Sequence, residues 1–266
     1  MTDTPASMSY GDYLGLDQLL GAQHPISSLH DEMLFIVIHQ TKELWLKQII
    51  RELKISLDLV REDALIQVHK SLSRVSRIQA VMTLSWDVLA TMTPSDYSSF
   101  RDVLGSSSGF QSAQFRQMEF MLGLKDSGHL KHHPEESTDH ADIGAALREP
   151  SLWDEAIRAL ARAGFDLPAG AIERDWSRRY QPSDTVEAAW VTVYQDPSRF
   201  WPLYQLAEKL VDIDDSLATW RHKHVVTVER VIGLKPGTGG TAGVAYLQST
   251  LSKRAFPELW SLRTGL

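Results

Sequence analysis

The sequence predicts an all-α protein, and three observations lead to this prediction. Apolar residues recur every three or four positions along most of the 266 residues, as they do on the buried face of a helix. No stretch alternates apolar and polar residues in the way a half-buried β-strand does. No internal repeat is present, and helical segments of similar character flank every loop-like stretch. We therefore expect residues 1–266 to form one domain, a helical bundle with long helices.

The composition excludes several classes of function. The chain has 27 basic and 34 acidic side chains, and its net charge of −7 disfavours binding to nucleic acids or anionic membrane surfaces. It has no cysteine, which excludes disulfides, iron–sulfur clusters, thiolate-bound or covalently attached haem and cysteine-containing zinc sites. The longest apolar run, residues 33–38, is too short to cross a bilayer, and no signal peptide is visible. We expect a soluble, cytoplasmic protein.

The first two long helices are predicted at about residues 28–60 and 68–89. Residues Met33 to Ile38 are apolar on every side of a helix, which indicates a buried helix centre. In the second helix, large residues follow steps of four and three, the spacing of helices in a bundle. This stripe consists of Val68, Leu72, Val75, Gln79, Met82, Trp86 and Leu89.

A shorter helix and two loops are also predicted. Thr93 followed by Pro94 is the pattern of an N-cap and a first helical residue, so we predict a helix that continues to about Leu104. Residues 125–139 have loop composition, and we place them at the surface as a long connection. The glycine-rich residues 234–243 form a second flexible segment.

The longest helix is predicted from about Pro197 to Ile232, where Gly233 ends it. Its inward stripe is apolar, with residues such as Leu203 and Leu217, but it contains polar positions as well. Polar side chains on a buried face need partners or a function. The three polar residues of this stripe are Asp214, Arg221 and His224.

Two interpretations of His224 are open. It could be a core histidine that forms a hydrogen bond with Asp214 or a backbone carbonyl. Alternatively, a bundle without cysteine can hold a haem iron through one neutral imidazole, with the porphyrin against apolar side chains. Arg221, one turn earlier, would then orient the surroundings of the imidazole or pair with a haem propionate or with Asp214.

Three further positions are candidates for a binding site. His39 lies one turn after Phe35 on the same helix face, and this pair is either core packing or the wall of an aromatic pocket. Tyr97 and Arg101 also lie four residues apart, which suits binding of a carboxylate but fits a surface arginine equally well. The glycine-rich loop lacks the features of a phosphate-binding loop. We interpret it as a mobile lid in which Thr238 donates a hydrogen bond.

Metal sites built from histidine alone are not supported. The Glu-x-x-His pairs of ferritin-like di-iron bundles do not occur in the sequence. His222 and His224 lie two residues apart on a helix, so they point to different faces and cannot chelate one ion. Nothing fixes the geometry of the histidines in and after the predicted surface loop. These histidines are His129, His132, His133 and His140.

Three long blocks of sequence resemble the tryptophan 2,3-dioxygenase family. The first comprises Tyr10-Gly-Asp-Tyr-Leu and His30-Asp-Glu-Met-Leu-Phe-Ile-Val-Ile-His-Gln-Thr-Lys-Glu-Leu-Trp-Leu-Lys. The second comprises Phe100-Arg-Asp-Val-Leu-Gly and Ser108-Gly-Phe-Gln-Ser. The third comprises Trp220-Arg-His-Lys-His, Arg230-Val-Ile-Gly and Lys235-Pro-Gly-Thr-Gly-Gly. The blocks occur in the family order, whereas residues between about 125 and 195 match only at scattered positions.

The resemblance implies a haem b enzyme that opens the indole ring of L-tryptophan with O₂ and forms N-formyl-L-kynurenine. It implies that His224 is the proximal iron ligand and that His39 is the distal histidine, hydrogen-bonded to the indole N–H. Phe35 would pack on the indole ring. Arg101, together with Tyr97, would bind the substrate carboxylate.

The resemblance also implies the rest of the site and the assembly. Thr238 would contact the substrate as its loop closes, Leu104 would belong to the substrate pocket, and Ser108 and Gly109 would line the distal side of the haem. The family assembles as a homotetramer of two dimers, in which the N-terminal segment, residues 1–24, reaches the site of a neighbouring subunit. The residues that would enter the neighbour's site are Tyr10, Tyr13 and Leu14.

Two alternative functions stay open at this point. A related haem enzyme could insert a single oxygen atom into tryptophan or a substituted tryptophan, although no motif residue departs from the dioxygenase pattern. A haem-binding gas sensor or carrier without turnover is the second alternative. Such a protein would not need Arg101, Tyr97 and Thr238 to converge on an amino-acid backbone.

Overall fold

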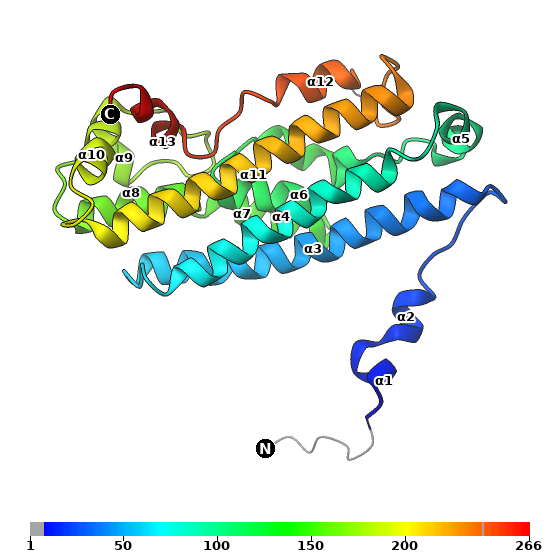
Figure 1. Ribbon diagram of the computed structural model, residues 1–266, viewed down its shortest axis with the longest axis horizontal. Helices are drawn as coiled ribbons and strands as arrows, with labels where there is room; N and C mark the ends of the chain where they lie inside the picture. Colours follow the sequence, from blue (N-terminus) through cyan, green and yellow to red (C-terminus); the bar gives the residue numbers. More distant parts are fainter. Residues whose placement is uncertain (1–7, 241) are drawn as a thin grey trace.

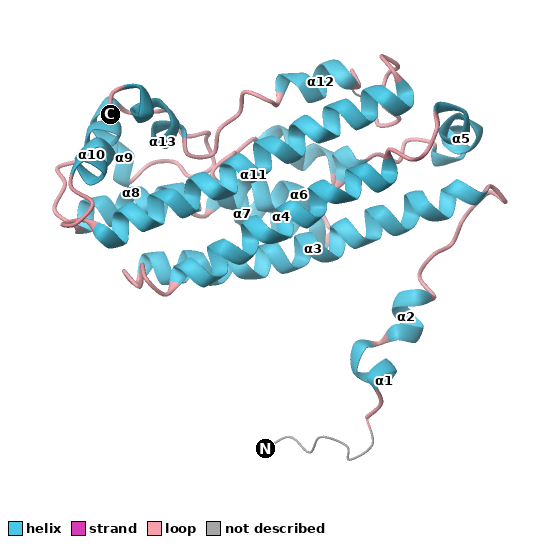
Figure 2. Cartoon of the chain, viewed as in Figure 1, coloured by secondary structure: helices cyan, strands magenta, loops and turns pink. Residues whose placement is uncertain are grey.

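All regular elements in the computed structural model are helices, and the structure describes residues 8–240 and 242–266. Three long helices lie side by side at its centre (Figure 1). They are α3 (His30–Arg61), α4 (Val68–Leu89) and α11 (Trp201–Ile232). Figure 2 shows no strand among the described residues, which confirms the all-α prediction. In the same residues, no helix combines the length and apolar character needed to span a membrane.

The boundaries of α3 and α4 agree with the predicted helices to within two residues, but α11 starts four residues later than predicted. The chain first turns after α10 (Asp184–Gln195), because Asp196 accepts a hydrogen bond from the backbone N–H of Arg199. Pro202 then occupies the first turn of α11, where its missing N–H costs nothing. The predicted end is confirmed: Gly233 has a φ of 64°, a value that favours glycine.

The helix predicted from Pro94 divides into two parts. α5 (Pro94–Phe100) begins with a capping box, in which Thr93 and Asp96 exchange two hydrogen bonds between side chain and backbone. The chain then tightens into the 3₁₀ helix η1 (Arg101–Leu104). This tightening places Arg101 at the junction of the two helices.

The prediction that residues 125–139 form a surface connection is wrong in part. They include a 3₁₀ helix, η3 (Ser127–His132), and the side chains of His129 and His133 are buried. Lys125 is 3% exposed because its ammonium group caps the end of α7 (Thr138–Arg148), where carbonyl groups lack helical partners. Its ammonium group donates to the carbonyl oxygens of Ala146, Leu147 and Glu149.

Most of the remaining elements pack against the sides and ends of the three long helices (Figure 1). At one end, the stacked indoles of Trp153 and Trp190 form a second part of the core, with ring centroids 5.9 Å apart. In contrast, α1 and α2 extend away from the bundle and bury no residue (Figure 1). The elements not yet named are α1 (Tyr10–Leu14), α2 (Leu16–Leu20), η2 (Gly109–Gln111), α6 (Ala113–Leu122), α8 (Leu152–Arg162), α9 (Ala169–Ile172), α12 (Val244–Ser249), α13 (Pro257–Ser261) and η4 (Leu262–Thr264).

Candidate active site

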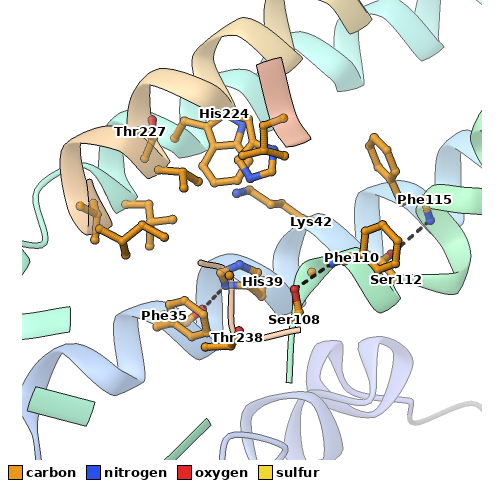
Figure 3. Close-up of a pocket in the computed structure, with 18 of the residues that line it drawn as sticks. Phe35, His39, Lys42, Ser108, Phe110, Ser112, Phe115, His224, Thr227 and Thr238 are labelled. Carbon is orange, nitrogen blue, oxygen red and sulfur yellow. Dashed lines mark hydrogen bonds between the residues drawn. The ribbon is translucent and has the colours of Figure 1, made fainter. Parts of the chain in front are cut away.

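A cavity of about 250 Å³ lies between α3, α4 and α11. The segment that contains η1 and η2 contributes to its wall, as does the loop that follows α11. Much of its lining is apolar. Met82, Leu89, Val228 and Val231 come from the helical stripes predicted to face inward, and Leu46 of α3 and Met92 after α4 also line the cavity. Figure 3 shows His39 and His224 facing this cavity from opposite helices.

The ring of His224 is held by aromatic stacking. It lies parallel to the indole of Trp86, with a centroid distance of 4.3 Å and an interplanar angle of 11°, and beside Trp220. Burial lowers its pKa to about 3, so the imidazole is neutral. Within the described residues neither ring nitrogen has a hydrogen-bond partner. The neutral ring therefore has a nitrogen lone pair available to a ligand in the cavity.

The interpretation of His224 as a core histidine bonded to Asp214 is wrong. The carboxylate of Asp214 instead accepts a hydrogen bond from the indole of Trp260, at 2.9 Å, and from the backbone N–H of Ala255, at 3.0 Å. Asp214 therefore binds the C-terminal segment to α11, and it does not line the cavity.

Arg221 also has other partners than the sequence predicted. Its guanidinium group contacts Glu119 at 2.8 Å and donates to the carbonyl oxygen of Lys253 at 3.1 Å, so a pair with Asp214 is not formed. Glu119 also binds Arg116 at 2.6 Å. These three buried groups form an ionic cluster at the cavity wall, one turn from His224.

The opposite wall is formed by His39 and Phe35. The Nδ1 atom of His39 lies 2.7 Å from the carbonyl oxygen of Phe35, and the two rings are 4.2 Å apart. Burial lowers the pKa of His39 to about 4, and the positive charge of Lys42 adds to this effect. Because a carbonyl oxygen can only accept, Nδ1 carries the hydrogen, and Nε2 is left as the acceptor of the neutral ring.

Tyr97 and Arg101 also line the cavity, near Phe35. The rings of Tyr97 and Phe35 are 6.0 Å apart, and burial raises the pKa of the Tyr97 phenol. The guanidinium group of Arg101 donates to the carbonyl oxygen of Pro236 in the glycine-rich loop. One N–H donor of Arg101 is therefore taken by a backbone carbonyl oxygen, whereas the sequence analysis assigned this side chain to the substrate carboxylate.

The glycine-rich loop rests on the segment before η2. The hydroxyl of Thr238 donates to the carbonyl oxygen of Ser107 at 2.6 Å. Gly239 lies so close to Ser108 that an added Cβ would be 2.6 Å from the Cβ of Ser108. Thr238, Ser108, Gly109 and Leu104 all line the cavity. Residue 241 of the predicted lid lies outside the described residues.

The N-terminal residues do not line this cavity. Tyr10 and Tyr13 are 76% and 77% exposed on α1, and Leu14 is 44% exposed. Their assignment to a neighbouring subunit stays a prediction. Residues 1–7 of the predicted N-terminal segment lie outside the described residues.

Comparison with known proteins identifies the family. A model of the tryptophan 2,3-dioxygenase family matches residues 2–192 and 171–266. The chain belongs to this family. It is 63% identical over 259 residues to a tryptophan 2,3-dioxygenase of Caulobacter vibrioides, covering 97% of this chain and 98% of that protein. It is 56% identical over 264 residues to a tryptophan 2,3-dioxygenase of Ralstonia pickettii, covering 99% of this chain and 95% of that protein.

Membership of the tryptophan 2,3-dioxygenase family implies the use of haem, and the residues of the cavity fit such a group. A neutral imidazole without a partner is a suitable axial ligand, and the apolar side chains around it suit the faces of a porphyrin. The described residues contain no group of three or more His, Asp or Glu side chains arranged to hold a metal ion.

The residues of the cavity that were missed by reasoning from the sequence include Lys42 and Trp86. Lys42 follows His39 by three residues and so shares its helix face, but we considered it only as part of a family motif. Trp86 was assigned to the core stripe of α4, although its ring lies against His224. Helical spacing alone could have placed Lys42 in the cavity, whereas the contact of Trp86 with His224 depends on how α4 packs on α11.

Proposed function

We propose that this chain is a haem-dependent dioxygenase that cleaves the indole C2–C3 bond of L-tryptophan with O₂ and forms N-formyl-L-kynurenine. One observation carries the proposal: three groups line one cavity. They are a neutral imidazole on α11 that has no hydrogen-bond partner among the described residues, an acceptor imidazole on α3 and a guanidinium group at α5–η1. L-Tryptophan has an indole N–H that can donate to the acceptor imidazole and a carboxylate that can bind the guanidinium group. The first group is free to hold the iron.

His224 would hold haem b without a covalent link to the porphyrin. Support comes from its neutral state and from the stacked Trp86, which restricts rotation of the imidazole. Ser108 and Gly109, at the start of η2, would line the other side of the porphyrin. When bound, ferrous haem supplies the oxygen chemistry, and the chain supplies orientation and exclusion of water.

The indole and its substituents would be oriented by side chains from α3 and η1. Phe35 offers an aromatic face, and Nε2 of His39 would accept the hydrogen bond from the indole N–H. Arg101 would exchange the carbonyl oxygen of Pro236 for the substrate carboxylate, with Tyr97 beside it. Leu104 would pack against the substrate from η1.

His39 would position the substrate without removing its proton. A base with a pKa of about 4 is too weak to take the proton of an indole N–H at neutral pH. The neutral ring nevertheless remains a good hydrogen-bond acceptor, so it would hold the indole in a defined orientation within the cavity. Such positioning lowers the entropic part of the barrier.

The glycine-rich loop would close the site. Thr238 already bridges to the segment before η2, through the carbonyl oxygen of Ser107. With tryptophan bound, we expect the Thr238 hydroxyl to turn toward the ammonium and carboxylate groups of the substrate. Closure would keep water from the reacting atoms.

We also propose a homotetramer built from two dimers, each chain contributing one domain. The helices α1 and α2 extend from the bundle and bury none of their residues in this chain. Tyr10, Tyr13 and Leu14 form an exposed apolar surface on α1, which is unfavourable in water and suits burial in a neighbouring subunit.

Labelled oxygen tests the proposed reaction. Ferrous enzyme is mixed with L-tryptophan and ¹⁸O₂, and the product is analysed by mass spectrometry and by the absorbance of N-formylkynurenine. We expect a product that contains both labelled atoms. A product with one labelled atom would identify a monooxygenase. Haem binding without any product would identify a sensor or carrier.

A further inference from the structure

Lys42 is a buried lysine that the proposed chemistry does not use. Burial lowers its pKa to about 7, so its side chain is mostly protonated below that pH. It lies on α3 and is 6% exposed. Its ammonium group has no hydrogen-bond partner among the described residues. The ammonium nitrogen lies 3.0 Å from the centroid of the Trp86 ring, so its contact is with the face of an indole. Figure 3 shows the side chain reaching between His39 and His224.

Trp86 connects this charge to His224. One indole contacts both groups: Lys42 through a cation–π interaction and His224 through a parallel stack at 4.3 Å. Among the described residues the indole nitrogen of Trp86 has no hydrogen-bond partner, so the ring is held by its contacts with Lys42, His224 and Trp220.

Nearby anions do not neutralise the charge of Lys42. Glu119 is the buried carboxylate of the cavity wall, and it is bound by both Arg116 and Arg221. Glu43, the residue after Lys42, accepts a hydrogen bond from the amide of Gln114 at 2.8 Å. A positive potential from Lys42 therefore acts at the imidazole in a region of low dielectric constant, where charges interact strongly.

We propose that Lys42 is a positioning residue whose ammonium group, acting through Trp86, raises the reduction potential of iron bound to His224. The inference rests on the proposed function, because it requires His224 to hold the iron. Ferric iron carries one more positive charge than ferrous iron, so an uncompensated cation nearby disfavours the ferric state. A cation on the face of the stacked indole also withdraws electron density from the side of the axial ligand.

The consequence for function is a larger fraction of ferrous enzyme under a given reducing condition. Ferrous iron is the state in which the proposed enzyme takes up O₂. Lys42 would thus keep the enzyme ready for turnover.

Spectroelectrochemical titration of the haem-loaded protein tests this role. At about pH 6 and a fixed potential, we expect Lys42→Met to lower the ratio of ferrous to ferric enzyme at least tenfold, which is about 59 mV for a one-electron couple. Lys42→Arg keeps the charge and should retain a ratio within threefold of the wild type. Lys47→Met removes an exposed charge from the same helix and serves as the matched control.

Three results would overturn the proposal. They are an unchanged ratio in Lys42→Met, an equal shift in Lys42→Arg, or an equal shift in the Lys47→Met control. Lys42→Gln provides a second uncharged side chain. If both uncharged variants fold but take up no haem, Lys42 acts in haem binding and the proposal is wrong.

Failure of the proposed function would be seen separately. The ferrous iron–histidine vibration is first recorded in the wild type and in the Lys42 variants by resonance Raman spectroscopy. A wild type without haem, or without an iron–histidine bond, contradicts the assignment of His224. An intact iron–histidine bond with an unchanged potential in Lys42→Met contradicts only the role of Lys42.

Discussion

The carbonyl oxygen of Phe35 lies 2.7 Å from Nδ1 of His39, one helical turn away on α3. Phe35 thereby determines the tautomer of His39, because the carbonyl requires a hydrogen on Nδ1. One residue supplies an aromatic face to the cavity and, through its backbone, directs the lone pair of its neighbour to Nε2. The local geometry of the helix thus prepares an acceptor for an indole N–H before substrate arrives.

Replacing His39 with alanine should lower kcat/KM for L-tryptophan. The indole N–H would lose its acceptor inside a closed site, which costs about 1–3 kcal/mol, or roughly 5- to 150-fold. Steady-state kinetics with 1-methyltryptophan provides the control, since this compound has no ring N–H to donate. An equal loss for both compounds would contradict the hydrogen-bonding role.

The stability of the haem-free protein should fall as the pH drops below about 6.5. The folded pKa of His39 is about 4, below the ordinary value of 6.5, so the unfolded chain takes up this proton first. The free energy of unfolding is then unaffected by His39 above pH 6.5. It decreases between pH 6.5 and 4, by about 1.4 kcal/mol for each unit of pKa difference at most. Urea unfolding at pH 7.5 and 5.0 measures the effect.

His39→Leu is the control for this pH dependence. His224 and His129 also have a lowered pKa and contribute in the same direction, so the variant should reduce the slope without abolishing it. A slope identical to that of the wild type would show that His39 is protonated equally in the folded and unfolded chains.

Replacing Arg101 with alanine should weaken tryptophan binding while haem content stays intact. The substrate carboxylate would lose a charged partner in a closed site, at a cost on the order of 2–5 kcal/mol. Arg101→Lys should recover only part of the affinity, because an ammonium group cannot bind a carboxylate in a bidentate manner. Binding titrations followed at the haem absorbance measure both variants.

Tryptamine serves as the control ligand for Arg101. It carries the indole and the ammonium group but no carboxylate, so its affinity should be the same in the wild type and in Arg101→Ala. Unchanged tryptophan affinity in the variant would reject the assignment.

Replacing His224 with alanine should remove haem from the purified protein. The bond to the iron would be lost, and the indole nitrogen of the stacked Trp86 carries a hydrogen and has no free lone pair to replace it. The Soret absorbance per protein measures haem content, and circular dichroism checks that the helices persist. Added imidazole should restore part of the absorbance by occupying the space left by the ring. A variant with full haem content would exclude His224 as the ligand.

Gly239→Ala should raise KM for tryptophan several-fold without loss of haem. The new Cβ would lie 2.6 Å from the Cβ of Ser108, so the loop could not rest on η2 as it does now. Gly170→Ala is the matched control, because nothing lies within 4 Å of its added Cβ and α9 does not line the cavity. Equal kinetics in the two variants would show that closure does not depend on this contact.

Features that depend on neighbours within a few residues could be predicted from the sequence. The N-cap at Thr93, the end of α11 at Gly233 and the extents of α3 and α4 all follow from local hydrogen bonds and helical spacing. The pairing of His39 with Phe35 on one face also follows, because residues four apart on a helix are neighbours. The family motifs then assigned these residues to a cavity.

Partners that are distant in the sequence were decided by the tertiary structure. Asp214 and Arg221 were recognised as buried polar residues, but their partners, Trp260 and Glu119, come from other elements. Lys125 was predicted to lie in a surface loop. It is buried because its ammonium group donates to carbonyl groups at the end of α7. Helical spacing determines which face a side chain occupies. Which groups meet that face depends on the packing of whole helices, and no local pattern encodes it.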